Sequence, residues 1–174
     1  MKRILAFFSV LFFISISFAQ NKCIEFLGIP LDLPFEDFTK ELKSKGFYPD
    51  FRYENTFVGT LYERQVGVTV YPLAETNTVE FVNVYFVFSD EIFMHTFYDE
   101  MKVQLSDEYK DELKKEITST EFYYPRFVIA LKKYKEDTEM DLNRCYGTIT
   151  MFRDKVGENR TINQLTIFYA RIIE

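Results

Sequence analysis

The spacing of apolar residues changes from a helical to a strand period twice along this chain, and this pattern limits the folds available to it. Phe35, Phe38 and Leu42 recur at helical spacing, and Gly46 follows as a natural helix end. The next segments are rich in β-branched and aromatic residues, which is typical of strands. We therefore expect one helix and then three strands, at Leu33–Phe47, Thr56–Tyr62, Val66–Tyr71 and Thr78–Phe88.

The same order restarts at Asp90, which suits the N-cap position of a helix. Apolar side chains then follow at four-residue intervals, which predicts a helix from Glu91 to Tyr109. The charged residues 110–115 indicate a loop or a helix end. Residues 125–136 fit a helix or a strand, and we expect a helix. The apolar residues that repeat every four residues in the Glu91–Tyr109 helix are Phe93, Phe97, Met101 and Leu105. A polar connection, Glu136–Asp141, then leads to two strands, Arg144–Phe152 and Arg160–Ile173. The two strands are joined by a hairpin-like link at Asp154–Asn159.

The predicted strands place apolar residues on one side. Val82, Val84 and Phe86 alternate with Asn83 and Tyr85, so one face of the strand is buried and the other is wetter, as in an antiparallel sheet. We expect an α+β fold of two consecutive helix-plus-antiparallel-sheet units, residues 20–89 and 90–174, which can pack as one domain.

The first 19 residues have the pattern of an export signal. Lys2 and Arg3 precede an uncharged apolar run, and Ser17-Phe18-Ala19 offers a small-x-small cleavage site. A membrane anchor is the alternative, but the uncharged run is at the short end for a spanning helix. Cleavage after Ala19 would leave 155 of the 174 residues, and no other apolar run in the sequence is long enough to span a membrane. We expect a periplasmic or extracellular protein.

Composition excludes several classes of function. The chain has 27 acidic and 21 basic side chains, a balance that argues against nucleic-acid binding. His95 is the only histidine, there is no Gly-x-Ser-x-Gly segment, and we expect His95 to be a half-exposed helix residue. The acidic run 136–141 lacks the spacing of a cation-binding loop. The sequence therefore predicts no catalytic residues, no cofactor and no metal site.

Two cysteines, Cys23 and Cys145, are the whole thiol complement. In an oxidising compartment they would tend to form a disulfide. Such a bridge would close a loop of roughly 120 residues and add about 4 kcal/mol of stability. Two separate thiols are the alternative, and the sequence does not decide between them.

The segment Phe26-Leu-Gly-Ile-Pro-Leu-Asp32 and the helix end Lys43-Ser-Lys-Gly-Phe47 are familiar. Together with Arg144-Cys145-Tyr146, they resemble a family of short exported proteins of Gram-negative anaerobes. Leu33-Pro34 departs from the small residues usual in that family after the aspartate. The family has no assigned activity, so the resemblance implies no catalytic residues. Its layout is similar to that of the β-lactamase inhibitor protein, a tandem of two helix-plus-sheet units.

Tyrosine is abundant, with 12 residues beside 20 Phe and no Trp. Most of these rings should build the core, but tyrosine is also frequent where proteins bind one another. We expect Tyr53, Tyr62, Tyr71 and Tyr85 on a sheet face that no helix covers. The hypothesis is an exported non-enzymatic, inhibitor-like protein that binds a protein partner. The alternatives are a hydrolase that uses paired carboxylates, and a structural component of the envelope.

Overall fold

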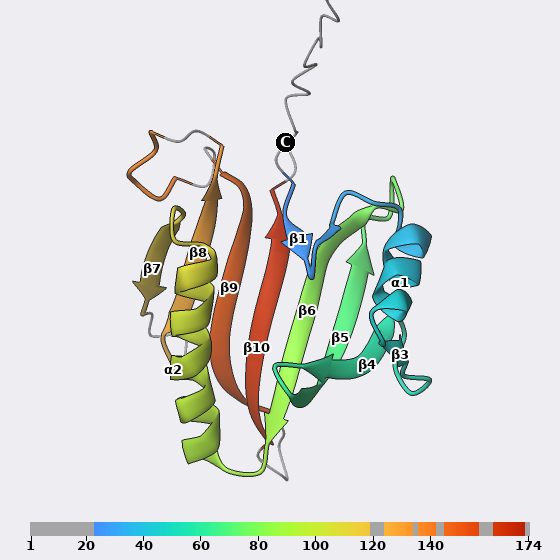
Figure 1. Ribbon diagram of the computed structural model, residues 1–174, viewed down its shortest axis with the longest axis horizontal. Helices are drawn as coiled ribbons and strands as arrows, with labels where there is room; N and C mark the ends of the chain where they lie inside the picture. Colours follow the sequence, from blue (N-terminus) through green and yellow to red (C-terminus); the bar gives the residue numbers. More distant parts are fainter. Residues whose placement is uncertain (1–22, 119–123, 134–135, 142–144, 157–161, 173–174) are drawn as a thin grey trace, which may run out of the picture.

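Eight strands form one antiparallel sheet in the computed structural model, which describes residues 23–118, 124–133, 136–141, 145–156 and 162–172 (Figure 1). The predicted leader lies outside these ranges, and so do residues 157–159 of the predicted link. The elements are β1 (Glu25–Phe26), β2 (Ile29–Pro30), α1 (Phe35–Ser44), β3 (Tyr48–Pro49), β4 (Thr56–Leu61), β5 (Arg64–Pro72), β6 (Val79–Phe88), α2 (Glu91–Glu108), β7 (Leu113–Ile117), β8 (Arg126–Lys132), β9 (Cys145–Val156) and β10 (Ile162–Arg171).

The strand order is β3-β4-β5-β6-β10-β9-β8-β7, and β1 and β2 form a separate hairpin. Helix α1 precedes β3–β6 in the chain, and α2 precedes β7–β10. The two sets of strands meet where β6 pairs with β10, with Val84 opposite Ile167. The predicted mixture of helix and antiparallel sheet is therefore confirmed, with sheet predominating, and the strands form one continuous sheet.

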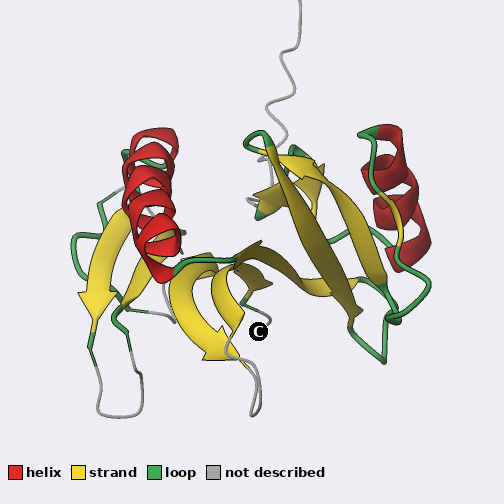
Figure 2. Ribbon diagram, turned by 90° about the horizontal axis from the view of Figure 1, so that it is seen from below, coloured by secondary structure: helices red, strands yellow, loops and turns green. Residues whose placement is uncertain are grey.

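Both helices lie on the same side of this sheet, as the view from below shows (Figure 2). The β1–β2 hairpin lies between them in front of the central strands (Figure 1). Ile24 approaches Gly147 so closely that a Cβ on the glycine would lie 3.2 Å from the Cβ of Ile24. The ring centroids of Phe26 and Tyr169 are 5.2 Å apart. This helix-bearing face, with α1, the hairpin and α2 on it, contains the main core.

Helix α1 forms as its sequence pattern predicts. Phe38 and Leu42 are fully buried, and Gly46 ends the helical segment in the left-handed region at φ 91°. Glycine adopts that conformation without a Cβ penalty. The acidic residues Glu36 and Asp37 occupy the first turn, where they complement the positive end of the helix dipole.

Helix α2 begins where predicted, with Asp90 Oδ1 accepting a hydrogen bond from Ile92 N at 2.6 Å. The predicted four-residue stripe is wrong at its first member, because Phe93 is 63% exposed and Met94 is buried instead. A helix turns through 360° in 3.6 residues, so each four-residue step advances the side chain by about 40° too far. Over three steps from Leu105 back to Phe93, this drift carries the side chain out of the core.

Two further predictions need correction. Residues 126–132 form strand β8, not the expected helix, and the five residues from Phe127 to Leu131 are all buried. A short continuous apolar run fits a two-sided buried strand as well as a helix. Residues 113–117 form the edge strand β7, which the charged composition had suggested was a loop. Lysines on an edge strand are a common protection against pairing with other chains.

The remaining strand predictions are confirmed within the described residues, except that β9 continues through Asp154–Val156, which the sequence assigned to the hairpin-like link. Val66, Val68 and Val70 are buried on the helix-bearing face, as are Val82, Val84 and Phe86 in the next strand. Neither α1 nor α2, the helices in the described part of the chain, combines the length and apolarity that a membrane crossing requires.

Candidate functional site

The face of the sheet opposite the helices, here called the open face, presents Gly67, Thr69 and Tyr71 of β5 and Tyr85 and Val87 of β6. These residues alternate with the buried valines of the same strands, so the strand period itself places them outward. Gly67 pairs directly with Tyr85.

Tyr85 lies flat over Gly67. A Cβ on the glycine would lie 2.0 Å from Cζ of Tyr85 and 2.2 Å from its hydroxyl oxygen. Any larger residue at position 67 would therefore displace the ring. Burial raises the pKa of Tyr85, and the negative charge of Asp50 raises it further.

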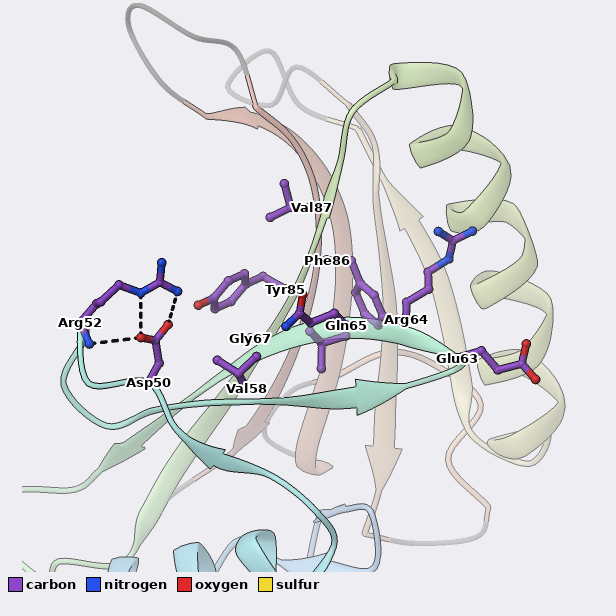
Figure 3. Close-up of a pocket in the computed structure, with 11 residues that line it drawn as sticks. Asp50, Arg52, Val58, Glu63, Arg64, Gln65, Gly67, Tyr85, Phe86 and Val87 are labelled. Carbon is purple, nitrogen blue, oxygen red and sulfur yellow. Dashed lines mark hydrogen bonds and ion pairs between the residues drawn. The ribbon is translucent and has the colours of Figure 1, made fainter.

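Two depressions adjoin the Tyr85 ring, and both are lined by Tyr85 and Val87. The first measures about 490 Å³, and its other lining side chains include Asp50, Arg52 and Arg64. Figure 3 shows the Tyr85 ring pointing from β6 toward the Asp50–Arg52 pair. These dimensions fall in the range of sites that accept a small molecule or a protruding side chain.

The second depression measures about 740 Å³. Tyr53, Tyr71 and Ile162 contribute its exposed apolar groups, while Thr69 and Gln164 contribute hydrogen-bonding groups. We call the exposed area formed by both depressions the Tyr85 surface, defined by Asp50, Arg52, Tyr53, Tyr71, Tyr85, Val87 and Ile162.

The Asp50–Arg52 pair closes one end of the first depression. Arg52 donates from Nε to Asp50 Oδ1 at 2.9 Å and from Nη2 to Oδ2 at 2.7 Å, and its backbone N–H also donates to Oδ1 at 3.1 Å (Figure 3). These hydrogen bonds lower the pKa of Asp50. The Asp50 side chain is 8% exposed and that of Arg52 is 77% exposed, so the carboxylate is covered and the guanidinium faces outward.

Three of the four predicted surface tyrosines gather at this place. Tyr53 is 62% exposed, Tyr71 is 38% exposed, and Tyr85 lies between the depressions. Tyr71 also stacks on Phe81 with ring centroids 4.2 Å apart. Tyr62 does not join them, because it lies in the β4–β5 turn with φ 51° and lines a different pocket.

Sequence reasoning missed three features at or beside this surface. Phe51 is 97% exposed beside the Asp50–Arg52 pair, and Gly67 is the residue over which the Tyr85 ring lies. The Asp-x-Arg spacing within a turn was the available signal for the ion pair, since an Asp side chain there can accept from the backbone two residues on. The signal for Gly67 was a glycine inside a valine-rich strand, which often marks a close approach.

The carboxylates of the first depression do not form a general acid–base pair. Asp50 accepts from Arg52 with both oxygens and its pKa is lowered, the opposite of what a general acid needs. Glu63 lies at the other end of the depression and points away from it (Figure 3). Within the residues that the structure describes, no three His, Cys, Asp or Glu side chains gather closely enough to hold a metal ion.

His95 is half-buried on α2 and belongs to a second polar cluster that the sequence did not indicate. Its Nδ1 pairs with Arg153 Nη1, and its Nε2 lies 3.4 Å from Glu91 Oε1. The Arg153 guanidinium lies 4.1 Å from the centroid of the Tyr98 ring and 4.9 Å from that of Tyr124. Burial raises the pKa of Tyr98 to about 12. These contacts tie α2 to β9.

Both cysteines are free thiols in the structure. Cys23 is half-buried, and Cys145 is buried and donates to Asp141 O at 3.2 Å. Burial raises the pKa of each thiol. The structure therefore describes separate thiols, and the disulfide stays a prediction for the oxidised protein.

Comparisons of this chain with protein-family models, with curated proteins and with solved structures gave no match.

Proposed function

We propose that this chain is an exported, non-enzymatic protein that binds a protein partner through the Tyr85 surface. The observation that carries the proposal is the gathering of Tyr53, Tyr71 and Tyr85 around two depressions on an open sheet face. Tyrosine and arginine are the residues most enriched where binding energy concentrates between proteins. Arg52 supplies an exposed guanidinium at the margin of the same surface.

The shape of the surface favours a folded partner with protruding side chains. The Tyr85 ring adjoins both depressions and is fixed by its position over Gly67. A ring held in place before binding loses little conformational freedom when a partner docks. Two adjacent depressions can accept two neighbouring side chains of the partner.

The element order supports a finer account of the fold. A helix precedes each set of four strands, and the last strands of the two sets, β6 and β10, pair at the centre of the sheet. We infer a tandem of two helix-plus-sheet units, with the boundary between β6 and α2, similar in layout to the β-lactamase inhibitor protein. Fold similarity does not fix function, so the binding proposal depends on the Tyr85 surface alone.

Capture from an envelope extract tests the binding proposal. The bait is the protein from residue 20 onward, as wild type, Tyr85→Ala and Phe93→Ala. Phe93 is an exposed aromatic residue on α2, on the helix-bearing side, and serves as the control at a site away from the Tyr85 surface. We expect a partner that wild type and Phe93→Ala retain and that Tyr85→Ala loses by at least about tenfold, because a central aromatic anchor contributes about 2 kcal/mol or more.

A partner held equally by all three baits would contradict the proposal. The variants fold alike if their circular dichroism spectra and urea midpoints agree, which separates lost binding from lost structure. Export is tested separately by sequencing the N-terminus of protein from the envelope. We expect Gln20, and a protein that begins at Met1 would contradict signal removal.

A further inference from the structure

A small, partly enclosed pocket lies on the helix-bearing side of the molecule, away from the Tyr85 surface. Its volume is about 100 Å³. It forms where the β1–β2 turn, the β4–β5 turn and the C-terminal end of α2 meet on Tyr169 of β10. We call it the tyrosine pocket after three of its lining residues, Tyr62, Tyr109 and Tyr169.

Aromatic rings make much of its lining. Tyr169 is only 5% exposed and packs against Phe26 with ring centroids 5.2 Å apart. Tyr62 and Tyr109 are half-buried and pack at the edge of the core. The pocket is therefore lined largely by aromatic ring surface.

The charged side chains that line the pocket are both acidic. Among the residues that the structure describes, Glu25 and Glu108 are the charged ones that line the pocket, and no Lys or Arg lines it. Glu108 is the last residue of α2, and just beyond it Lys114 Nζ donates to the backbone oxygens of Tyr109 and Lys110. Burial and the negative charge of Glu108 raise the pKa of Tyr109, and the same causes act on Tyr169.

We propose that the tyrosine pocket binds the head group of an alkylammonium cation. Aromatic rings attract such a cation through their faces, and aromatic boxes are a recurring way to recognise quaternary ammonium groups. Glu108 at the rim supplies the opposite charge. An alkylammonium group also presents methyl or methylene surface to Phe26 and Leu61, which a small hydrated metal ion does not.

Two sources could supply this group: a free quaternary ammonium compound, or a lysine side chain of another protein. Binding of tetramethylammonium and of n-butylammonium to the protein from residue 20 onward distinguishes them. Tert-butanol, a neutral compound of similar shape, and potassium chloride are the controls. Tyrosine ring resonances in NMR spectra report occupancy, and ultraviolet absorbance reports phenol ionisation.

We expect one or both ammonium ions to shift the tyrosine resonances, and the two controls to leave them unchanged. A bound cation should also lower the pH at which the pocket phenols ionise. A preference for tetramethylammonium assigns a free quaternary compound, and a preference for n-butylammonium assigns a lysine. Shifts of equal size with tert-butanol or potassium chloride would overturn the proposal. The absence of any shift with both ammonium ions would also overturn it.

Variants locate the binding. Glu108→Gln should weaken ammonium binding about tenfold, because it removes the charged partner. Glu100→Gln, on the same helix and equally exposed, should bind as wild type does. Tyr62→Phe retains the ring and should retain binding, whereas Tyr62→Leu should weaken it severalfold. Unchanged affinity in both Glu108→Gln and Tyr62→Leu would refute the assignment. Tyr85→Ala should have no effect, so this result is independent of the Tyr85 surface.

Discussion

The half of the sheet that follows α1 and the half that follows α2 differ in how fully they are covered. Helix α1 has 10 residues and buries three of them, whereas α2 has 18 residues and buries five. Strand β8 of the α2 half is buried on both faces, whereas β5 and β6 of the α1 half expose Tyr71 and Val87 on the open face. The α1 half thus holds most of the candidate binding surface, to which the α2 half contributes Ile162 of β10.

The largest expected effect tests whether the halves share one core. Phe38→Ala in α1 should cost about 3–5 kcal/mol and Met101→Ala in α2 about 2–5 kcal/mol, because both side chains are fully buried. Since β6 and β10 join the halves, each variant should unfold in a single urea transition, followed by circular dichroism, whose midpoint is lower than that of wild type. Two separate transitions would show that the halves unfold independently.

Two glycines sharpen the comparison between the faces. Gly59 lies under the buried Phe47 ring, and a Cβ there would be 2.4 Å from Cδ1. Gly59→Ala should therefore destabilise the protein by about 1–3 kcal/mol. Gly67→Ala displaces only the outward Tyr85 ring, so we expect a smaller loss of stability but loss of partner binding. Urea unfolding measures the loss of stability, and the capture assay measures the loss of partner binding. Equal losses of stability and of binding in the two variants would contradict the different roles of the two glycines.

The two helices also begin differently. Asp90 caps α2 through its side chain, whereas Pro34 stands before α1 without a side-chain cap. Asp90→Ala should cost about 1 kcal/mol, since it leaves the Ile92 N–H without its acceptor. Pro34→Ala removes no such bond and should cost less. Urea midpoints compare the two variants, and an equal cost would show that the Asp90 hydrogen bond contributes little.

The smallest effect concerns pH and the Asp50–Arg52 pair. Because the folded protein lowers the pKa of Asp50, the pair stabilises the fold above the unfolded value of about 3.9. This contribution is lost as the pH falls through the lower pKa of the folded state. The urea midpoint of wild type should thus exceed that of Asp50→Asn at about pH 7, and the gap should narrow at about pH 3. A gap that is constant with pH would show that the charge does not matter.

Local patterns predicted the elements whose burial is one-sided. The strands around Val68 and Val84, the cap at Asp90 and the helix end at Gly46 all follow from period and residue type. Strand β8 could not be distinguished from a helix, because a run buried on both faces has no period. The pairing of β6 with β10 also lies beyond local patterns, since it joins residues far apart in the chain.

The candidate site was predictable only in part. Alternation in β6 places Tyr85 outward, and alternation in β5 does the same for Tyr71. Tyr62 was misplaced because it lies at a turn, where strand alternation no longer fixes the direction of a side chain. The depressions depend on the distance between Tyr53 and Ile162, which no local pattern contains.

The position of β10 has a consequence for how the molecule assembles. The segment 162–171 supplies a central strand, so a growing chain that has released only residues up to 156 has two half-sheets with bare edges at β6 and β9. Bare edges pair readily with other molecules. Until the last strand is inserted between them, the chain is exposed to aggregation and to proteases, and a helper that shields these edges would raise its yield.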